Sequence, residues 1–475
     1  MQRDGGEENP CASPSPFPPV KAASVAPSPL PPRSHLVPLD SPAFVVSFGP
    51  VSSPFAFRTR PRLEARGSPF PRVPAFPRAS PRGCDLGVSD AHRGPSGPLE
   101  IPERFLMGPG PGNANPRVLQ AQALPLLGHM HPPFFSIMDE IRGGLQYVFQ
   151  TSSPYTALIS GTGHAAMEAS VINLCERGEL LLVVRHGVWG TRAAEMARRQ
   201  GVRVEFVEVE PGCVVPIETL KAKLRELRPK MLFTVQGDSS TGVLQPLEGL
   251  AETARETGTL LAVDTVCSLG GVPFFFDRWG IDLVYSGAQK CLAAPPGSAP
   301  IALSRRAVDA VAARKTPCPS YYLDLSQIGA YWGWFLPETP RPYHHTGMVS
   351  TWYGVREALA VVAEQGLPAM WARHKAVDDE LWAGLEELGL ERFVADDDAF
   401  LLTVNTIVVP EGVDAAKLSA HAMQRFSVEI SGGLGPLAGK VWRVGIMGYN
   451  AQPINVRMVL AAFKEGLEAQ GWKKQ

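Results

Sequence analysis

The sequence predicts an α/β protein whose main sheet is mostly parallel and doubly wound. From about residue 101, continuous apolar runs alternate with segments of helical periodicity. Apolar runs without polar alternation are typical of strands buried on both faces, and the helical segments supply the crossovers that parallel strands need. The runs lie at 180–185, 203–209, 231–236, 260–266 and 282–286, and the helical segments at 165–175, 190–201, 217–227 and 247–258.

The chain divides unevenly around this core. Residues 1–100 hold 21 of the 46 prolines, so we expect a disordered or polyproline-like leader, because proline removes backbone donors and disfavours helix before it. Residues 101–365 are expected to form the large α/β domain with an N-terminal arm. Residues 366–475 are expected to form a smaller α+β domain, because helical patterns at 369–389 and 456–470 flank strand patterns at 401–409 and 441–446.

Composition excludes several classes of function. The formal charge is −1 over 475 residues, so there is no concentrated basic field for a nucleic acid backbone. No apolar run approaches the roughly 20 residues that a membrane-spanning helix needs. Seven cysteines without a CxxC spacing argue against a disulfide framework or a structural zinc site. We therefore expect an intracellular enzyme that binds neither nucleic acid nor membrane.

Polar residues follow three of the predicted strands. Asp264 ends one strand, Lys290 follows the next, and Ser239 and Ser240 follow a third. Because the carboxyl ends of parallel strands form one edge of the sheet, where ligands bind in such folds, we expect these side chains to share a crevice.

An acid and a lysine at neighbouring strand ends match the needs of pyridoxal 5′-phosphate (PLP) chemistry. A lysine amine forms the Schiff base with the cofactor aldehyde, and a carboxylate keeps the pyridine nitrogen protonated so that the ring accepts electrons. The glycine-rich turn Ser160-Gly161-Thr162-Gly163-His164 opens a helical segment and offers backbone N–H groups to a phosphate. Trp189 lies just past a strand end, where it either stacks on the ring or is a core tryptophan.

Residues 101–475 resemble the alanine–glyoxylate (serine–pyruvate) aminotransferases, which belong to class V of the fold-type I PLP enzymes. The strings that carry the resemblance are Gly108-Pro109-Gly110-Pro111, Ile137-Met138-Asp139-Glu140-Ile141, Ser160-Gly161-Thr162-Gly163-His164, Ser239-Ser240-Thr241-Gly242-Val243-Leu244-Gln245-Pro246, Val263-Asp264-Thr265-Val266, Tyr285-Ser286-Gly287-Ala288-Gln289-Lys290 and Tyr343-His344-His345-Thr346. Nothing in the family pattern accounts for residues 1–100.

The resemblance implies a role for each matching residue. Lys290 carries the cofactor and, once freed, shuttles the substrate proton, while Asp264 partners the pyridine nitrogen and Trp189 stacks on the ring. The cofactor and its phosphate are surrounded by Thr162, Gly163, His164, Ser239 and Gln289.

Two further roles concern the substrate and the neighbouring subunit. Tyr343 and Thr346 are implied to reach the phosphate of the neighbouring subunit, so the active site is expected to belong to a homodimer. Arg443 is implied to clamp the substrate α-carboxylate in a bidentate fork. From the residues alone, Arg443 in an apolar stretch is equally typical of a structural ion pair.

The implied reaction is a ping-pong transamination through pyridoxamine phosphate. L-alanine, or L-serine with pyruvate as acceptor, donates the amino group, and glyoxylate becomes glycine. Partners are therefore small amino acids and 2-oxo acids. One alternative is a non-catalytic fold-type I scaffold, although a scaffold does not need Lys290. Another is a cysteine desulfurase, for which Cys318 between two prolines is the one cysteine that resembles an exposed nucleophile.

No metal is expected. His344 and His345 are adjacent, so their side chains should point apart in an extended stretch, and no third ligand is apparent. The resemblance implies a peroxisomal location, with the mitochondrial matrix as the alternative. The final Lys473-Lys474-Gln475 departs from the usual small-basic-Leu peroxisomal signal.

Overall fold

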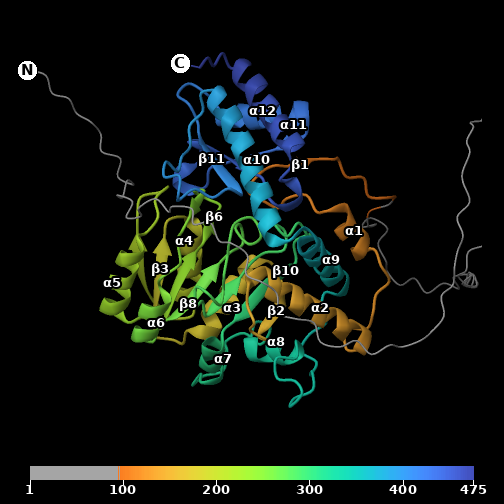
Figure 1. The fold of residues 1–475 in the computed structure, drawn as a ribbon, viewed down its shortest axis with the longest axis vertical. Coiled ribbons are helices and arrows are strands. Elements are labelled where there is room, and N and C mark those ends of the chain that lie inside the picture. Colours follow the sequence, from red (N-terminus) through yellow and green to blue (C-terminus); the bar gives the residue numbers. More distant parts are fainter. Residues whose placement is uncertain (1–94, 96, 475) are drawn as a thin grey trace, which may run out of the picture. The chain divides into compact units, whose positions relative to one another are not determined.

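The computed structural model describes residue 95 and residues 97–474, and the predicted leader, residues 1–100, lies almost wholly outside this part. The residues from Pro102 onward belong to one compact unit. Its centre is a seven-stranded sheet (Figure 1). The strands are β2 (Thr156–Ser160), β3 (Leu180–Arg185), β4 (Arg203–Glu208), β5 (Met231–Val235), β8 (Leu260–Asp264), β9 (Leu283–Tyr285) and β10 (Ser298–Leu303).

The sheet order is β2-β10-β9-β8-β5-β3-β4. The pairs from β9 to β4 are all parallel, whereas β10 runs antiparallel to both β9 and β2. The prediction of a mostly parallel sheet is therefore confirmed. Strands β2, β5, β8 and β10 are buried along their whole length, as expected for strands covered on both faces.

Helices supply the crossovers, so that α4, α5 and α6 connect β3, β4, β5 and β8 in turn. The predicted segment 217–227 coincides with α5, and 165–175 overlaps α3. The helices of this part are α1 (Pro116–Gln122), α2 (Pro132–Phe149), α3 (Gly163–Leu174), α4 (Val188–Arg199), α5 (Ile217–Leu227), α6 (Ala251–Thr257), α7 (Arg305–Ala312), α8 (Leu325–Tyr331) and α9 (Val349–Gln365).

The C-terminal part has its own sheet and hydrophobic cluster, built around Trp382, Trp442 and Phe463. Its main sheet has the order β11-β14-β13, and Figure 1 shows β11, α10, α11 and α12 gathered in blue. The division at residue 365 stays a prediction. The elements are α10 (Leu367–Glu387), β11 (Val404–Val408), α11 (Ala415–Phe426), β13 (Ser431–Gly432), η2 (Gly435–Leu437), β14 (Val441–Gly445), η3 (Gly448–Asn450) and α12 (Pro453–Glu468).

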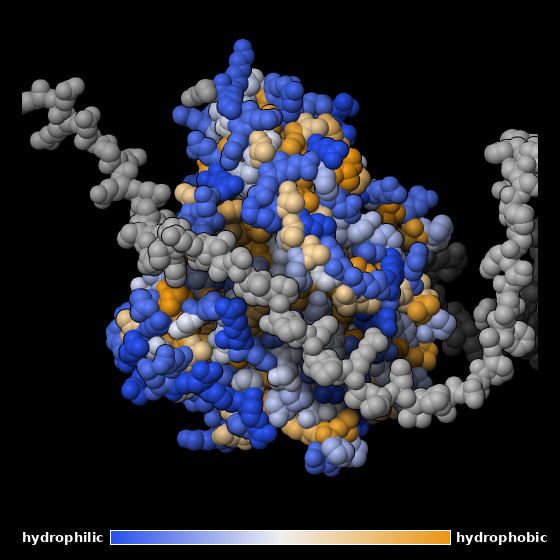
Figure 2. Space-filling view, viewed as in Figure 1, coloured by the Kyte–Doolittle hydropathy of each residue, from blue (hydrophilic) through white to orange (hydrophobic). Residues whose placement is uncertain are grey.

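Two short strand pairs complete the structure. The N-terminal arm contributes β1 (Phe105–Leu106), which pairs in parallel with β12 (Val428–Glu429). Strands β6 (Gly237–Asp238) and β7 (Val243–Leu244) form an antiparallel pair after β5. The face in Figure 2 is mostly hydrophilic, with apolar residues in small groups. Among the described residues, no helix combines the length and apolar character needed to cross a membrane.

Candidate active site

The carboxyl ends of the parallel strands converge on one cavity of about 220 Å³. Strand β8 ends there at Asp264, the loop after β9 brings Lys290, and β3 leads into α4 with Trp189. Eight of the residues predicted for the site meet here, which is what the strand-end argument requires. The lining residues are Thr162, Gly163, His164, Met167, Trp189, Gly237, Ser239, Asp264, Val266, Cys267, Gln289 and Lys290.

Asp264 is a buried carboxylate, 3% exposed. Its Oδ1 accepts from the Val266 backbone N–H at 2.7 Å, and its Oδ2 accepts from the Tyr285 hydroxyl at 2.6 Å. Burial raises the pKa of Asp264 to about 6, and the hydrogen bonds from Tyr285 and Val266 oppose that rise. In the described chain no arginine or lysine forms an ion pair with this carboxylate, so it is held in place without a cation. A cationic ligand group in the cavity would stabilise its charged form.

Lys290 lies on the opposite wall and is 9% exposed. Its Nζ donates a hydrogen bond to the Pro109 carbonyl oxygen in the N-terminal arm. Gly110 has a φ of +108° and approaches the lysine so closely that a Cβ there would collide with the Lys290 side chain. The Gly108–Pro111 segment therefore fits against Lys290 because Gly110 is a glycine.

Trp189 and the start of α3 form the other walls. The Trp189 indole Nε1–H donates to Ser239 Oγ at 2.9 Å, and its ring makes an edge contact with His164 at 5.6 Å between centroids. Thr162 is the extended N-cap of α3, and its side chain does not cap the helix. The first N–H groups of α3 thus remain available for a phosphate, and burial lowers the pKa of His164 beside them.

Comparison with known proteins agrees with this geometry. The class V aminotransferase family model matches residues 119–452. The chain is 47% identical to the alanine–glyoxylate aminotransferase of Drosophila melanogaster, covering 78% of this chain and 94% of that protein, and 45% identical to that of Rattus norvegicus, covering 78% and 90%. The chain belongs to the class V aminotransferases.

Solved structures support the same assignment. The alanine–glyoxylate aminotransferase of Nostoc sp. is 44% identical with a TM-score of 0.78 and covers 80% of this chain and 99% of that one. The ureidoglycine–glyoxylate aminotransferase of Bacillus subtilis is 35% identical with a TM-score of 0.77 and covers 79% and 96%. The predictions of an enzyme and of the fold-type I aminotransferase architecture are confirmed.

The family implies PLP, and the cavity of this class V aminotransferase fits it. Asp264 is a carboxylate without a cation, Lys290 offers an amine, and the free N–H groups of α3 suit a phosphate. In addition, Gln289 Oε1 is buried without a hydrogen-bond partner, as expected for an acceptor that faces a ligand.

Three residues predicted for the site do not line this cavity. Arg443 is 5% exposed, and its guanidinium donates to the carbonyl oxygens of Gly432 at 2.8 Å and Ser239 at 2.9 Å. The alternative that Arg443 forms a structural ion pair finds no acidic partner among the described residues. Tyr343 is 61% exposed, and Thr346 is also exposed, away from the cavity of their own chain.

The expectation that His344 and His345 point apart is wrong. Their Nδ1 atoms lie 2.8 Å apart, and His345 Nε2 lies 2.6 Å from Ser160 Oγ. The rings meet because the segment bends here instead of running as a strand. Within the described residues no group of three or more His, Cys, Asp or Glu is placed to hold a metal ion.

The structure adds residues that the sequence did not single out. Cys267 lines the cavity, and burial raises its pKa. Tyr285 orients Asp264, although its position in a buried strand predicts only a core residue. Cys318 is not in the cavity, and burial raises its pKa, whereas a nucleophilic thiol needs a lowered pKa. No observation favours the desulfurase.

Proposed function

We propose that this chain transfers the amino group of L-alanine to glyoxylate, forming pyruvate and glycine, and also uses L-serine with pyruvate. The observation that carries the proposal is the pairing of Lys290 and Asp264 across one cavity with Trp189 and the start of α3. Support for the substrates comes from the names of the relatives at 44–47% identity.

PLP is the cofactor of the proposed reaction. When bound, it supplies an electron-accepting pyridine ring that stabilises negative charge at the substrate α-carbon. Asp264 would hold the ring nitrogen in its protonated form, Trp189 would cover the ring, and the N–H groups of α3 would bind the phosphate. Lys290 would take the proton from the α-carbon as a general base and return it as a general acid.

The proposed substrates are small because the described cavity has few charged groups. Lys290 is its single lysine, and no arginine lines it. We place the substrate carboxylate at Arg443, whose hydrogen bond to the Ser239 carbonyl brings it to the edge of the cavity. A dicarboxylic donor would need a second cation.

The test is an assay of purified protein with a panel of amino donors and with glyoxylate or pyruvate as acceptor. Alanine with glyoxylate should give the highest kcat/KM, and the protein should show the visible absorption band of lysine-bound PLP. Lys290→Ala should lose both the band and the turnover. A wild-type protein that stays colourless after incubation with PLP would contradict the proposal and favour a scaffold.

We also propose a homodimer in which Tyr343 and Thr346 bind the phosphate in the neighbouring subunit. Their exposure and their distance from the cavity of their own chain support this arrangement. Mixing Lys290→Ala subunits with Tyr343→Phe/Thr346→Ala subunits should restore activity, because each hybrid dimer holds one site with all its groups. Failure of hybrid dimers to gain activity would contradict shared sites.

A peroxisomal location is proposed from the family resemblance, with the mitochondrial matrix as the alternative. Imaging of the full-length protein beside a form that lacks residues 1–100 tests both. The peroxisomal proposal expects both forms in peroxisomes. Mitochondrial staining that disappears with the leader would favour the alternative.

A further inference from the structure

The turn after β5 contacts two groups that belong to different parts of the candidate site. Ser239 Oγ accepts from the Trp189 indole N–H at 2.9 Å, and the Ser239 carbonyl oxygen accepts from Arg443 Nη1 at 2.9 Å. One residue therefore holds the ring platform on α4 and the cation on β14. Any shift of this turn moves both.

Asp238 holds the turn in place from behind. It is 0% exposed, and its Oδ1 accepts from the Ser240 backbone N–H at 2.8 Å and from the Ser240 hydroxyl. Ser240 Oγ in turn accepts from the Val188 N–H at 3.0 Å, at the start of α4. The N-cap of α4, Gly187, lies so close that a Cβ there would collide with the Asp238 carboxylate.

The other oxygen of Asp238 faces a histidine. His186 Nδ1 and Asp238 Oδ2 are 4.0 Å apart, both side chains are almost fully buried, and neither atom has a hydrogen-bond partner. His186 Nε2 lies 3.1 Å from the Val235 carbonyl oxygen. Because a carbonyl oxygen can only accept, Nε2 carries a proton. Without a further proton, two buried acceptors would face each other, which is unfavourable.

We propose that His186 and Asp238 share one proton, and that this buried pair acts through the turn at Ser239 and Ser240 to position Trp189 and Arg443. The shared proton follows from the contact itself. Its consequence for catalysis rests on the proposed function.

Several ionisable groups on other elements act on the pair. Burial lowers the pKa of His186, and Asp238 raises it. Asp238 is also among the groups that raise the pKa of Asp264 on β8, that of Cys267 and that of Arg443 on β14. A proton held between His186 and Asp238 reduces the negative charge next to Asp264, which favours the ionised form that a pyridinium partner needs.

The shared proton can be measured on the cofactor-free protein. Selective ¹⁵N labelling of the ten histidines, with His186→Gln to assign the signal, gives the state of each ring nitrogen by NMR. We expect Nδ1 of His186 to appear protonated or strongly hydrogen bonded at neutral pH. An Nδ1 signal typical of a bare, unprotonated nitrogen would overturn the shared proton, whatever reaction the protein catalyses.

Positioning is tested with two variants of Asp238. Asp238→Ala removes the acceptor of Ser240, so the dissociation constant for PLP and the KM for the amino donor should each rise about tenfold, as expected for a lost hydrogen bond to a charged group. Asp238→Asn should recover most of both losses, because its amide oxygen still accepts from Ser240 and its NH₂ can donate to His186 Nδ1. No recovery by Asn, or unchanged constants in the Ala variant, would overturn the positioning role.

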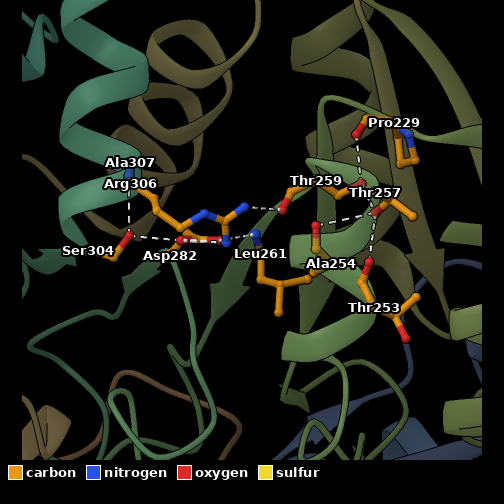
Figure 3. Close-up of polar contacts among 10 residues, drawn as sticks. All are labelled: Pro229, Thr253, Ala254, Thr257, Thr259, Leu261, Asp282, Ser304, Arg306 and Ala307. Atoms are coloured by element: carbon orange, nitrogen blue, oxygen red, sulfur yellow. Dashed lines mark hydrogen bonds and ion pairs between the residues drawn. The ribbon is translucent and has the colours of Figure 1, made fainter. Parts of the chain in front are cut away.

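A matched control separates positioning from general stability. Asp282 is a second buried carboxylate of the same sheet, and it contacts Ser304, Arg306 and Leu261 instead of the cavity (Figure 3). Asp282→Ala should lower the melting temperature without changing PLP affinity or KM. If it weakened both as much as Asp238→Ala does, the positioning role would be wrong. PLP affinity is read without turnover, so a failed transamination assay would not obscure the result.

Discussion

Asp264 and Asp282 are buried carboxylates at opposite ends of neighbouring parallel strands, and their surroundings differ in one respect. Asp264 ends β8 and receives hydrogen bonds from Tyr285 and the Val266 N–H, both uncharged donors. Asp282 directly precedes β9 and receives the Leu261 N–H at 3.0 Å, the Ser304 hydroxyl at 2.8 Å and Arg306 at 2.9 Å (Figure 3). Burial raises the pKa of both.

The difference separates a binding group from a structural one. The charge of Asp282 is balanced within the chain, and its ion pair joins the start of β9 to α7 through Arg306. Asp264 has comparable burial but no cation at hydrogen-bond distance within the described chain, and it faces a cavity. A buried charge without a partner is unfavourable, so it is expected where a ligand supplies the partner.

The largest expected effect comes from removing the charge of Asp264. Asp264→Asn should lower turnover about 1,000-fold, close to 4 kcal/mol of barrier, because a neutral amide cannot hold a pyridinium charge. Stability should change little, since both uncharged donors keep an acceptor or lose one contact. Steady-state kinetics and thermal melting measure the two. Near-normal turnover would remove Asp264 from the chemistry.

The second effect falls on stability alone. Asp282→Ala should lower the free energy of unfolding by about 3 kcal/mol, because it leaves buried donors and part of the Arg306 charge without a partner. Arg306 is 37% exposed, so water recovers some of this loss. The turnover of the folded fraction should be unchanged. Urea unfolding and active-site titration test this, and a loss of kcat in the folded fraction would contradict the contrast.

The third effect is a pH dependence of the cofactor-free protein. The pKa of Asp264 is raised to about 6 when folded, above the unfolded value, so its contribution to stability is fully present below about pH 4 and is lost as the pH rises through 6. The free energy of unfolding should fall by about 1.5 kcal/mol between pH 5 and pH 8 on this account.

Two comparisons isolate that slope. Asp264→Asn should remove it, because the amide does not titrate. Saturating PLP should also remove it, since a pyridinium beside the carboxylate favours the charged form. Any slope that Asp282 contributes should survive both changes. Urea unfolding across the pH range gives the values, and an Asp264→Asn slope equal to that of the wild type would refute the assignment.

The smallest effect concerns the hydroxyl that orients Asp264. Tyr285→Phe removes the donor at 2.6 Å from Oδ2 and should reduce turnover about fivefold, near 1 kcal/mol. Ser304→Ala is the counterpart at Asp282 and should cost a similar amount of stability without affecting turnover. Equal effects of the two variants on kcat would erase the distinction between the two carboxylates.

Much of the fold could be predicted, because its signals are local. The apolar run 180–185 and the helical segment 217–227 coincide with β3 and α5. Strand β10 was missed because Pro300 interrupts its strand pattern and because it runs antiparallel within a parallel sheet. The meeting of Asp264, Lys290 and Trp189 followed from the strand-end rule. The contact between His344 and His345 did not, because it depends on a bend in the chain.

The sequence by itself determined which strands end in an acid and which is followed by a lysine, because burial patterns and the residues after them are written along neighbouring positions. Only the tertiary structure decided which carboxylate has a cation and which faces a cavity. Those contacts join distant positions, such as Arg443 with Ser239 or Lys290 with Pro109. Local periodicity carries no information about such pairs, since they form when separate elements pack together.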